Sequence, residues 1–285
     1  MFKTIETTIP IPGLSRELRL LQITDLHLIH TDDRETNEVQ AMAARQVEWF
    51  PYVDEVMESL KQYLRHENLD CVVFTGDILG FPSQKNMEVF REFLHQECPR
   101  YLYVFGNHDR MFTLDDLNEA TCRQYTEQLS FAIQGDPELQ VLELDGVRLV
   151  GVDDSDGQFS EAQVVVLTQL MQQSKPCLMF MHIPLYLPGF GEKVTARWGQ
   201  PLMIGNPFEV KPDMLPELMP TPTTTRFVQR LRGQSGAIRG IFTGHVHFFD
   251  CIDHVCGDCM QYVTPMAITG ESYGVGRLIH LIPTE

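Results

Sequence analysis

The sequence predicts an α/β fold built around strands that are buried on both faces. Apolar runs of five to seven residues recur along the chain, each bounded by polar or turn residues, as expected of a strand covered on both sides. Segments with helical spacing of apolar residues alternate with these runs through the first two thirds of the chain. Because no repeat or linker divides its 285 residues, we expect residues 1–285 to form a single domain.

The expected elements follow one another in a regular order. The runs expected to form buried strands are Leu18–Thr24, Cys71–Thr75, Tyr101–Phe105, Cys177–Met181 and Ile238–Thr243. The segments expected to form helices are Thr36–Glu48, Val53–His66, Gln84–Gln96, Leu114–Leu129 and Ser160–Gln173. Ser160 is expected to be the N-cap of the last helix.

Two tight turns are also expected. Leu139–Leu144 and Val147–Val152 flank Asp145-Gly146, a dipeptide typical of a hairpin between two strands. The C-terminal part of the chain returns to strand patterns, with Gly257-Asp258 as its turn.

The segment 184–222 interrupts this regularity. It carries eight prolines and several glycines and shows no clean periodicity, so we expect a long loop without regular structure. Such a loop inside a compact domain is usually functional. Because it begins directly after His182, we expect it to form a lid over the site. Its largest apolar side chains, Trp198 and Phe208, are expected to pack within the lid or to stack on a ring of the substrate.

Composition excludes several classes of partner. The formal charge of −17 argues against binding to nucleic acid or to an anionic membrane, because both require a basic surface. No apolar stretch is long enough to span a bilayer, and the N-terminus does not resemble a signal peptide. The seven cysteines lack the spacing of a disulfide framework. A reducing, cytoplasmic location is therefore expected.

Each of the five expected buried strands ends in a polar block. The blocks are Asp25-Leu-His27, Gly76-Asp77, Gly106-Asn107-His108-Asp109, His182 and Gly244-His245-Val246-His247. Ligands in open α/β sheets bind beyond the carboxyl ends of the strands. The recurrence of Asp, Asn and His at this position therefore predicts one site at a common edge.

The residue types in these blocks indicate transition-metal binding. Carboxylate and imidazole together suit Mn, Fe or Zn better than Ca or Mg alone, although the ligand set does not select among the three. The candidate ligands are Asp25, His27, Asp77, Asn107, His182, His245 and His247. Seven ligands are too many for one ion with open positions, but they suit two ions that share a carboxylate. Paired metals of this kind catalyse phosphoryl transfer.

In their order and spacing, these blocks resemble the signature of the calcineurin-like metallophosphoesterases over about residues 20–250. The resemblance implies a four-layer α/β/β/α sandwich of two mixed β-sheets flanked by helices. It further implies that one metal ion is held by Asp25, His27 and His247.

The resemblance assigns the remaining residues as well. A second metal ion would be held by Asn107, His182 and His245, and Asp77 would bridge the two ions. His108 would stand off the metals, beside the leaving group, as the catalytic general acid. A hydroxide that bridges the metals would attack phosphorus.

Two branches of the family fit poorly. Purple acid phosphatases carry a tyrosine ligand three positions after the bridging aspartate, where this sequence has Gly80. Phosphoprotein phosphatases carry Asp-Arg-Gly from that position and a glutamate after the Asn-His pair. This chain has Gly80-Phe81-Pro82 and Asp109 instead. The pattern is closer to the bacterial-type phosphohydrolases and cyclic-nucleotide phosphodiesterases.

The sequence therefore predicts a metal-dependent phosphodiesterase or phosphatase that acts on a small phosphorylated substrate. Two alternatives remain: a nuclease of the same fold, which the acidic charge disfavours, and a catalytically silent binding or scaffold module. The silent module is disfavoured because all seven ligands and His108 are present.

Other polar residues near the blocks receive simpler interpretations. His30 and Asp109 are expected to order their loops, with contact to substrate or metal as the alternative for His30. Asp153 and Asp154 are expected to cap a turn, with hydrogen bonds to the residues of the site as the alternative. His254, Cys256 and Cys259 are expected to be plain strand residues, although an incomplete zinc site or a disulfide is the alternative.

Overall fold

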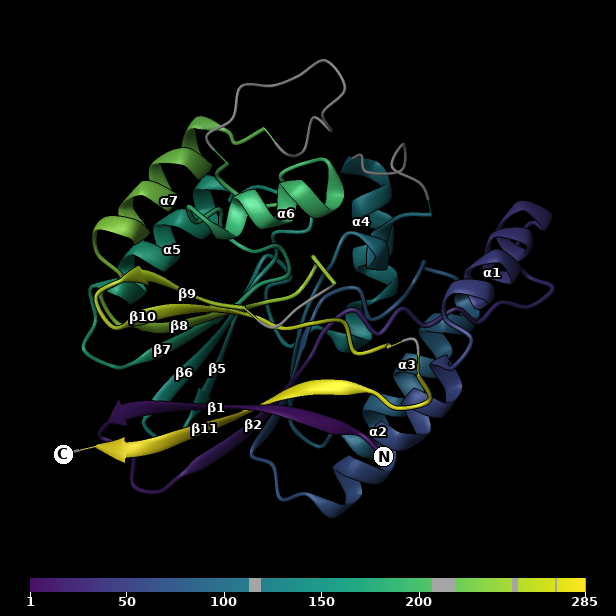
Figure 1. Ribbon diagram of the computed structural model, residues 1–285, viewed down its shortest axis with the longest axis horizontal. Coiled ribbons are helices and arrows are strands. Elements are labelled where there is room, and N and C mark those ends of the chain that lie inside the picture. Colours follow the sequence, from purple (N-terminus) through teal and green to yellow (C-terminus); the bar gives the residue numbers. More distant parts are fainter. Residues whose placement is uncertain (113–118, 207–218, 248–250, 270, 285) are drawn as a thin grey trace.

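The computed structural model describes residues 1–112, 119–206, 219–247, 251–269 and 271–284. Two mixed β-sheets lie face to face, and helices cover the outer face of each sheet (Figure 1). The four-layer α/β/β/α arrangement expected for this chain is thereby confirmed.

The first sheet contains the N- and C-terminal strands and three of the expected strands. Its order is β1 (Lys3–Pro12), β11 (Val275–Thr284), β2 (Leu18–Ile23), β3 (Cys71–Thr75) and β4 (Tyr101–Val104). Strands β2, β3 and β4 are parallel to one another, whereas β11 runs antiparallel to β2. The carboxyl ends of β2, β3 and β4 therefore lie at the same edge.

The second sheet has a parallel centre and antiparallel edges. Its order is β5 (Leu139–Leu144), β6 (Val147–Val152), β7 (Cys177–Phe180), β8 (Ile238–Thr243), β10 (Cys259–Val263) and β9 (Cys251–Cys256). Both expected turns are confirmed, since β5 pairs with β6 and β9 pairs with β10 in antiparallel fashion.

The helices form the outer layers. Helices α1 (Asn37–Trp49), α2 (Val53–His66) and α3 (Gln84–Glu97) lie on the side of the first sheet (Figure 1). Helices α5 (Glu161–Met171), α6 (Phe190–Trp198) and α7 (Pro222–Gly233) lie on the side of the second sheet, and α4 spans Glu119–Gln128. Ser160 caps α5 through a reciprocal capping box with Gln163. The first residues of the helix expected over Leu114–Leu129 lie outside the described residues.

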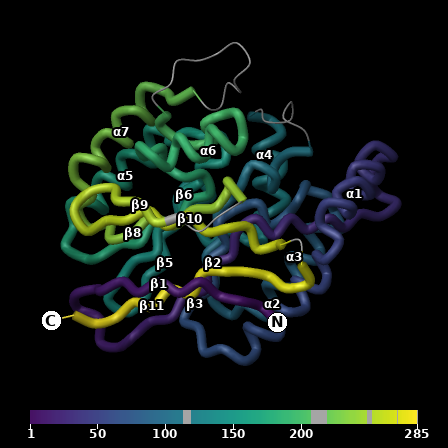
Figure 2. The backbone as a smooth tube through the Cα atoms, viewed as in Figure 1, coloured from purple at the N-terminus to yellow at the C-terminus, as the bar shows by residue number. Residues whose placement is uncertain are grey.

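Three apolar layers hold together the two sheets and their helices, whose backbone path is traced in Figure 2. Successive side chains of β3 pack into two different apolar layers. Val72 and Phe74 pack toward the helices of the first sheet, whereas Val73 packs into the layer between the sheets. The rings of Phe180 and Phe242 stack in that middle layer, with centroids 5.0 Å apart. This packing brings the matching edges of the two sheets together.

The expectation of a structureless loop over 184–222 is wrong in part. Helix α6 forms within it, and Leu185 and Ile204 are joined in an isolated parallel bridge. Both of these residues are buried, as are Phe190 and Val194 of α6. The segment is therefore anchored in the core of the second sheet, at least in its described part. Phe208 lies outside the described residues.

None of the helices in the described part of the chain combines the length and the apolar character needed to cross a membrane.

Candidate metal centre

The five polar blocks meet at one place, where the carboxyl edges of the two sheets face each other. Asp25 and His27 follow β2, Asp77 follows β3, and Asn107 and His108 follow β4. From the second sheet, His182 follows β7, and His245 and His247 follow β8. The prediction that these residues share one edge is confirmed.

The backbone at this edge is strained in a specific way. Among the described residues, the only non-glycine residues with positive φ are five of the predicted ligands: Asp25, His27, Asp77, His245 and His247. Their φ values lie between 47° and 67°, a left-handed conformation that costs an L-residue on the order of 1–3 kcal/mol. Such strain persists only where the surrounding structure enforces it, and it clusters at functional sites.

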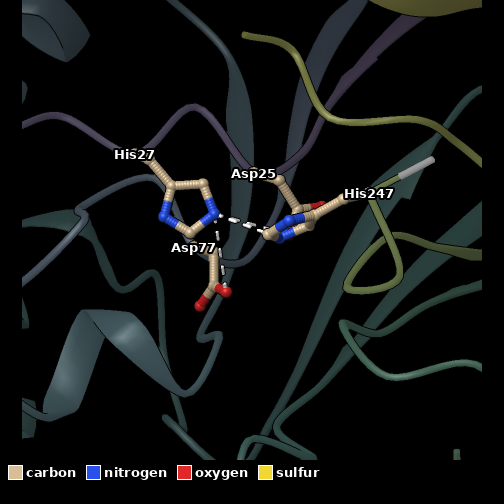
Figure 3. Close-up of side chains that lie close together, drawn as sticks. All are labelled: Asp25, His27, Asp77 and His247. Atoms are coloured by element: carbon tan, nitrogen blue, oxygen red, sulfur yellow. Dashed lines mark hydrogen bonds and ion pairs between the residues drawn. The ribbon is translucent and has the colours of Figure 1, made fainter. Parts of the chain in front are cut away.

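One group of four side chains forms the first half of the centre (Figure 3). Asp25, His27, Asp77 and His247 each offer one ligand atom, and these atoms all lie within 4.8 Å of one another. Nε2 of His247 lies 3.1 Å from Oδ1 of Asp25 and 3.2 Å from Nε2 of His27. Two imidazole nitrogens this close repel each other unless a proton or a cation lies between them.

A second group shares Asp77 with the first. Asp77, His182 and His245 offer ligand atoms within the same 4.8 Å limit. Nε2 of His182 lies 3.2 Å from Oδ2 of Asp77 and 3.1 Å from Nδ1 of His245. Nearby, Oδ1 of Asn107 is buried without a hydrogen-bond partner among the described residues. A buried oxygen without a partner, in a block at the edge where the imidazoles cluster, fits a metal ligand. The two groups thus fit two ions that share one carboxylate.

Hydrogen bonds to the remaining atoms orient the same side chains. Oδ2 of Asp25 accepts from the backbone N–H of His245 at 2.9 Å and from the hydroxyl of Thr24 at 2.6 Å, which leaves Oδ1 facing the imidazoles. The Nδ1–H of His182 donates to the carbonyl oxygen of Thr75 at 2.8 Å, so its Nε2 faces Asp77. Such outer contacts fix the tautomer and direction of metal-binding side chains.

Two glycines make this close approach possible. A Cβ at Gly106 would collide with the backbone nitrogen and the carboxylate of Asp77. A Cβ at Gly244 would collide with Thr24 and with the carboxylate of Asp25. Gly106 and Gly244, which precede Asn107 and His245, are therefore required because any larger residue would collide with the carboxylates of Asp77 and Asp25.

The buried carboxylates and imidazoles of the candidate centre shift one another's pKa values. Burial alone would lower the pKa of His182, but the charge and hydrogen bond of Asp77, together with the charges of Asp25 and Asp154, outweigh burial and raise this pKa to about 10. Burial would raise the pKa of Asp25, but the charge and hydrogen bond of His247, together with the charge of His182, outweigh burial and lower this pKa to about 2. For His27 and His245 burial dominates, and each pKa falls to about 3.

His108 lies at the margin of the centre. Its backbone N–H donates to Oδ1 of Asp77 at 2.8 Å, and its ring packs edge-on against that of His27, with centroids 5.0 Å apart. Its Nδ1 lies 3.1 Å from the carbonyl oxygen of Gly80 and therefore carries the hydrogen of that bond. His108 belongs to neither ligand group among the described residues.

Two buried aspartates hold the loops that carry the predicted ligands. Asp109 accepts from the backbone N–H groups of Asp77, Leu79 and Gly106 at 2.8–2.9 Å, as expected of a loop-ordering residue. Asp154 does more than cap a turn, because its two oxygens accept from the backbone N–H groups of His182 and Ile183, each at 2.8 Å. The alternative role of Asp154, hydrogen bonding to a residue of the site, is therefore the one that the structure supports.

The remaining candidates lie away from the centre. Nε2 of His30 pairs with Asp54 at 3.4 Å, and its backbone N–H bonds to Asn86, so the residue orders its loop as expected. Asp153 pairs with Arg110. Cys256 and Cys259 lie opposite each other in the β9–β10 hairpin and are free thiols, and within the described residues neither belongs to a metal-binding group.

Trp198 occupies an unexpected position. Its indole N–H donates to the carbonyl oxygen of Val246 at 3.1 Å, and its ring packs edge-on against His247, with centroids 5.9 Å apart. The tryptophan of segment 184–222 therefore contacts the loop between His245 and His247.

Comparison with known proteins agrees with this geometry. The family model for calcineurin-like phosphoesterase matches residues 18–249. Comparison with curated protein sequences gives no significant match. The fold is similar to that of a dimetal phosphatase from Danio rerio, with a TM-score of 0.53 and 15% identity over 90% of this chain and 89% of that one.

A second solved structure, the purple acid phosphatase PPD1 from yellow lupin (Lupinus luteus), has a TM-score of 0.52 and 15% identity. The match covers 95% of this chain and 45% of the lupin chain, so this chain spans less than half of that protein. Likeness at this identity concerns the fold alone. The match of the family model spans most of the sequence, and the chain belongs to the calcineurin-like phosphoesterase family.

Proposed function

We propose that this protein is a metal-dependent phosphoesterase that uses two metal ions to hydrolyse a small phosphorylated substrate, either a diester or a monoester. The observation that supports it most is the sharing of Asp77 between two groups of ligand atoms. Asp25, His27 and His247 would hold one ion, Asn107, His182 and His245 the other, and Asp77 both. Mn, Fe and Zn all suit this ligand set.

Two ions bound there would supply Lewis acidity toward the phosphoryl oxygens and would lower the pKa of water at the site. The protein's own part is to keep this arrangement rigid. Asp25 and Asp77 contribute negative charge in a buried setting, while Asp109 and Asp154 fix the backbone from which Asp77 and His182 extend. Rigid, preorganised charge of this kind is the main source of catalysis in phosphoryl transfer.

His108 supplies the proton in this proposal. Its Nδ1–H bond to Gly80 holds the ring in place, and in its protonated form Nε2 would donate a proton to the leaving oxygen. His108 therefore acts as a general acid beside the metals rather than as a ligand.

The described part of segment 184–222 forms one side of the substrate site in this proposal. Its support is the contact of Trp198 with the loop that carries His247. The buried anchoring of Leu185 and Ile204 argues for a fixed wall rather than a mobile lid.

The test is hydrolysis of bis(p-nitrophenyl) phosphate and of p-nitrophenyl phosphate by metal-stripped protein, before and after addition of Mn²⁺, Zn²⁺ or Fe²⁺. Release of p-nitrophenol that depends on added metal supports the proposal. No release with any of the three metals, from protein shown to bind them, would favour the silent binding module.

A further inference from the structure

A cavity of about 290 Å³ opens beside the candidate metal centre. It is lined by Trp49 and Phe50 at the end of α1, by His247, by residues of the segment 265–269 and by Val275. His247 is thus shared between the cavity and the first ligand group. A molecule whose phosphate is held at the centre would have this cavity within immediate reach.

The chemistry of the cavity is apolar. The described residues that line it include no aspartate, glutamate, lysine or arginine, and apart from His247 and Thr269 they are hydrophobic. Phe50 stacks on the ring of His27, with centroids 5.6 Å apart and the ring planes within 6° of parallel. This wall is therefore continuous with the ligand side chains and suits a neutral, flat group.

Trp49 adds a large uncovered surface to this wall. The residue is 71% exposed, although it borders the cavity. A single exposed apolar residue is common on protein surfaces. A tryptophan at the mouth of an apolar cavity, beside a site for phosphate, is better explained by a ring that packs against it.

The volume of the cavity limits the size of the organic group that could bind in it. An apolar cavity of about 150 Å³ holds one benzene ring. A cavity of about 290 Å³ therefore has room for one ring or a fused pair of rings.

We infer that this cavity is a substrate subsite for a neutral aromatic group esterified to the phosphate, so that the substrate is a phosphate ester of an aromatic or aromatic-bearing alcohol. This inference rests on the proposed phosphoesterase function. Trp49, Phe50 and Met266 are its specificity-determining residues, because they supply apolar surface from two separate segments of the chain.

The test compares the binding of two phosphonates that cannot be hydrolysed, phenylphosphonate and methylphosphonate, to metal-loaded protein by titration calorimetry. Both present the same charged group to the metals, and they differ in the organic group alone. We expect phenylphosphonate to bind about 10-fold more tightly, because the ring buries apolar area that a methyl group does not.

Substitutions in the cavity test which residues cause the preference for phenylphosphonate over methylphosphonate. Trp49→Ala and Met266→Ala should each reduce the preference to about 3-fold or less while metal content stays unchanged, and Trp49→Phe should retain most of it. Val47→Ala is the matched control, since Val47 is an exposed apolar residue on the same helix that does not line the cavity.

Equal binding of the two phosphonates to wild-type protein would overturn the aromatic subsite and leave the proposed function intact. A preference that neither Trp49→Ala nor Met266→Ala reduces would also overturn it. If neither phosphonate binds to protein that contains its metals, both the subsite and the proposed function are wrong.

Discussion

The carboxylate of Asp25 accepts a hydrogen bond from the backbone N–H of His245 at 2.9 Å, although Asp25 follows β2 of one sheet and His245 follows β8 of the other. A second bond crosses in the same direction, from Nδ1 of His182 to the carbonyl oxygen of Thr75. The centre therefore depends on how the two sheets pack, and each ligand group contains side chains from both sheets.

Asp77→Asn should lose most activity and most metal. The change keeps the shape of the side chain but removes the negative charge shared by both ligand groups. Loss of a residue that merely orients a ligand costs about 10–100-fold in metal affinity or activity, so a shared ligand should cost at least 100-fold. Metal content by mass spectrometry and hydrolysis rate are measured on the same preparation. Asp156→Asn, at an exposed residue outside both ligand groups, is the control. If Asp77→Asn matches it, Asp77 is not a ligand.

His108→Ala should retain both metals but lose roughly 10²–10⁴-fold in rate, as expected for removal of a general acid. The loss should be greatest for a nucleoside 5′-monophosphate, whose leaving hydroxyl needs a proton. It should be smaller for p-nitrophenyl phosphate, because p-nitrophenolate leaves without one. The rates for both substrates check this.

Equal losses for the two substrates with unchanged metal content would mean that His108 positions the substrate instead. His30→Ala serves as the matched control, because His30 pairs with Asp54 outside the centre, and it should retain activity.

Asp154→Ala should destabilise the protein and weaken the group that contains His182. The substitution leaves two buried backbone N–H groups without their acceptor, at a cost of about 1–3 kcal/mol each. Denaturant unfolding with metal chelated measures the stability loss, and metal titration measures the affinity loss. Asp156→Ala, two residues along the chain, removes a carboxylate that contacts the backbone of Gln158 rather than that of His182, and it should leave metal affinity unchanged. Unchanged metal affinity in folded Asp154→Ala would show that the backbone of His182 needs no such support.

Stability should depend on pH in opposite directions with and without metal. Asp77 raises the pKa of His182 from its ordinary 6.5 to about 10. In metal-free protein, protonated His182 therefore contributes to the free energy of unfolding in full below pH 6.5, and this contribution is lost as pH rises toward 10. The raised pKa of His247 beside Asp25 acts in the same direction. Metal binding requires neutral imidazoles, so bound metal should stabilise more as pH rises.

The measurement is the free energy of unfolding at about pH 6.5 and about pH 8.5, with chelator and with excess metal. The same slope under both conditions would contradict the assignment of His182 and His247 as ligands.

The buried strands and most helices were predictable because their sequence signals are local. Cys71–Thr75 and Ile238–Thr243 form strands over the residues predicted, since a strand covered on both faces is a short, mainly apolar run bounded by turn residues. Val53–His66 is the predicted helix without change. The edge at which the polar blocks meet follows from the parallel direction of these strands.

Other features depend on contacts that are remote in sequence. Strand β1 contains Pro10 and Pro12, which argue against a strand in the sequence. The prolines are accommodated because β1 is an edge strand, which pairs only with β11 from the other end of the chain. Helix α6 is short and lies among prolines, so its periodicity was hidden, and its stability comes from burial of Phe190 and Val194. The left-handed backbone of the predicted ligands is only weakly marked by residue type, because Asp and His adopt it more often than most residues but the fold imposes it.

The most direct test of the central claim is the number of metal ions bound per chain. Protein loaded with excess Mn²⁺, freed of unbound ions by gel filtration and analysed by mass spectrometry, should contain two ions per chain, as two ligand groups that share Asp77 require. A value of one or fewer at saturation would contradict the binuclear centre and the mechanism proposed from it.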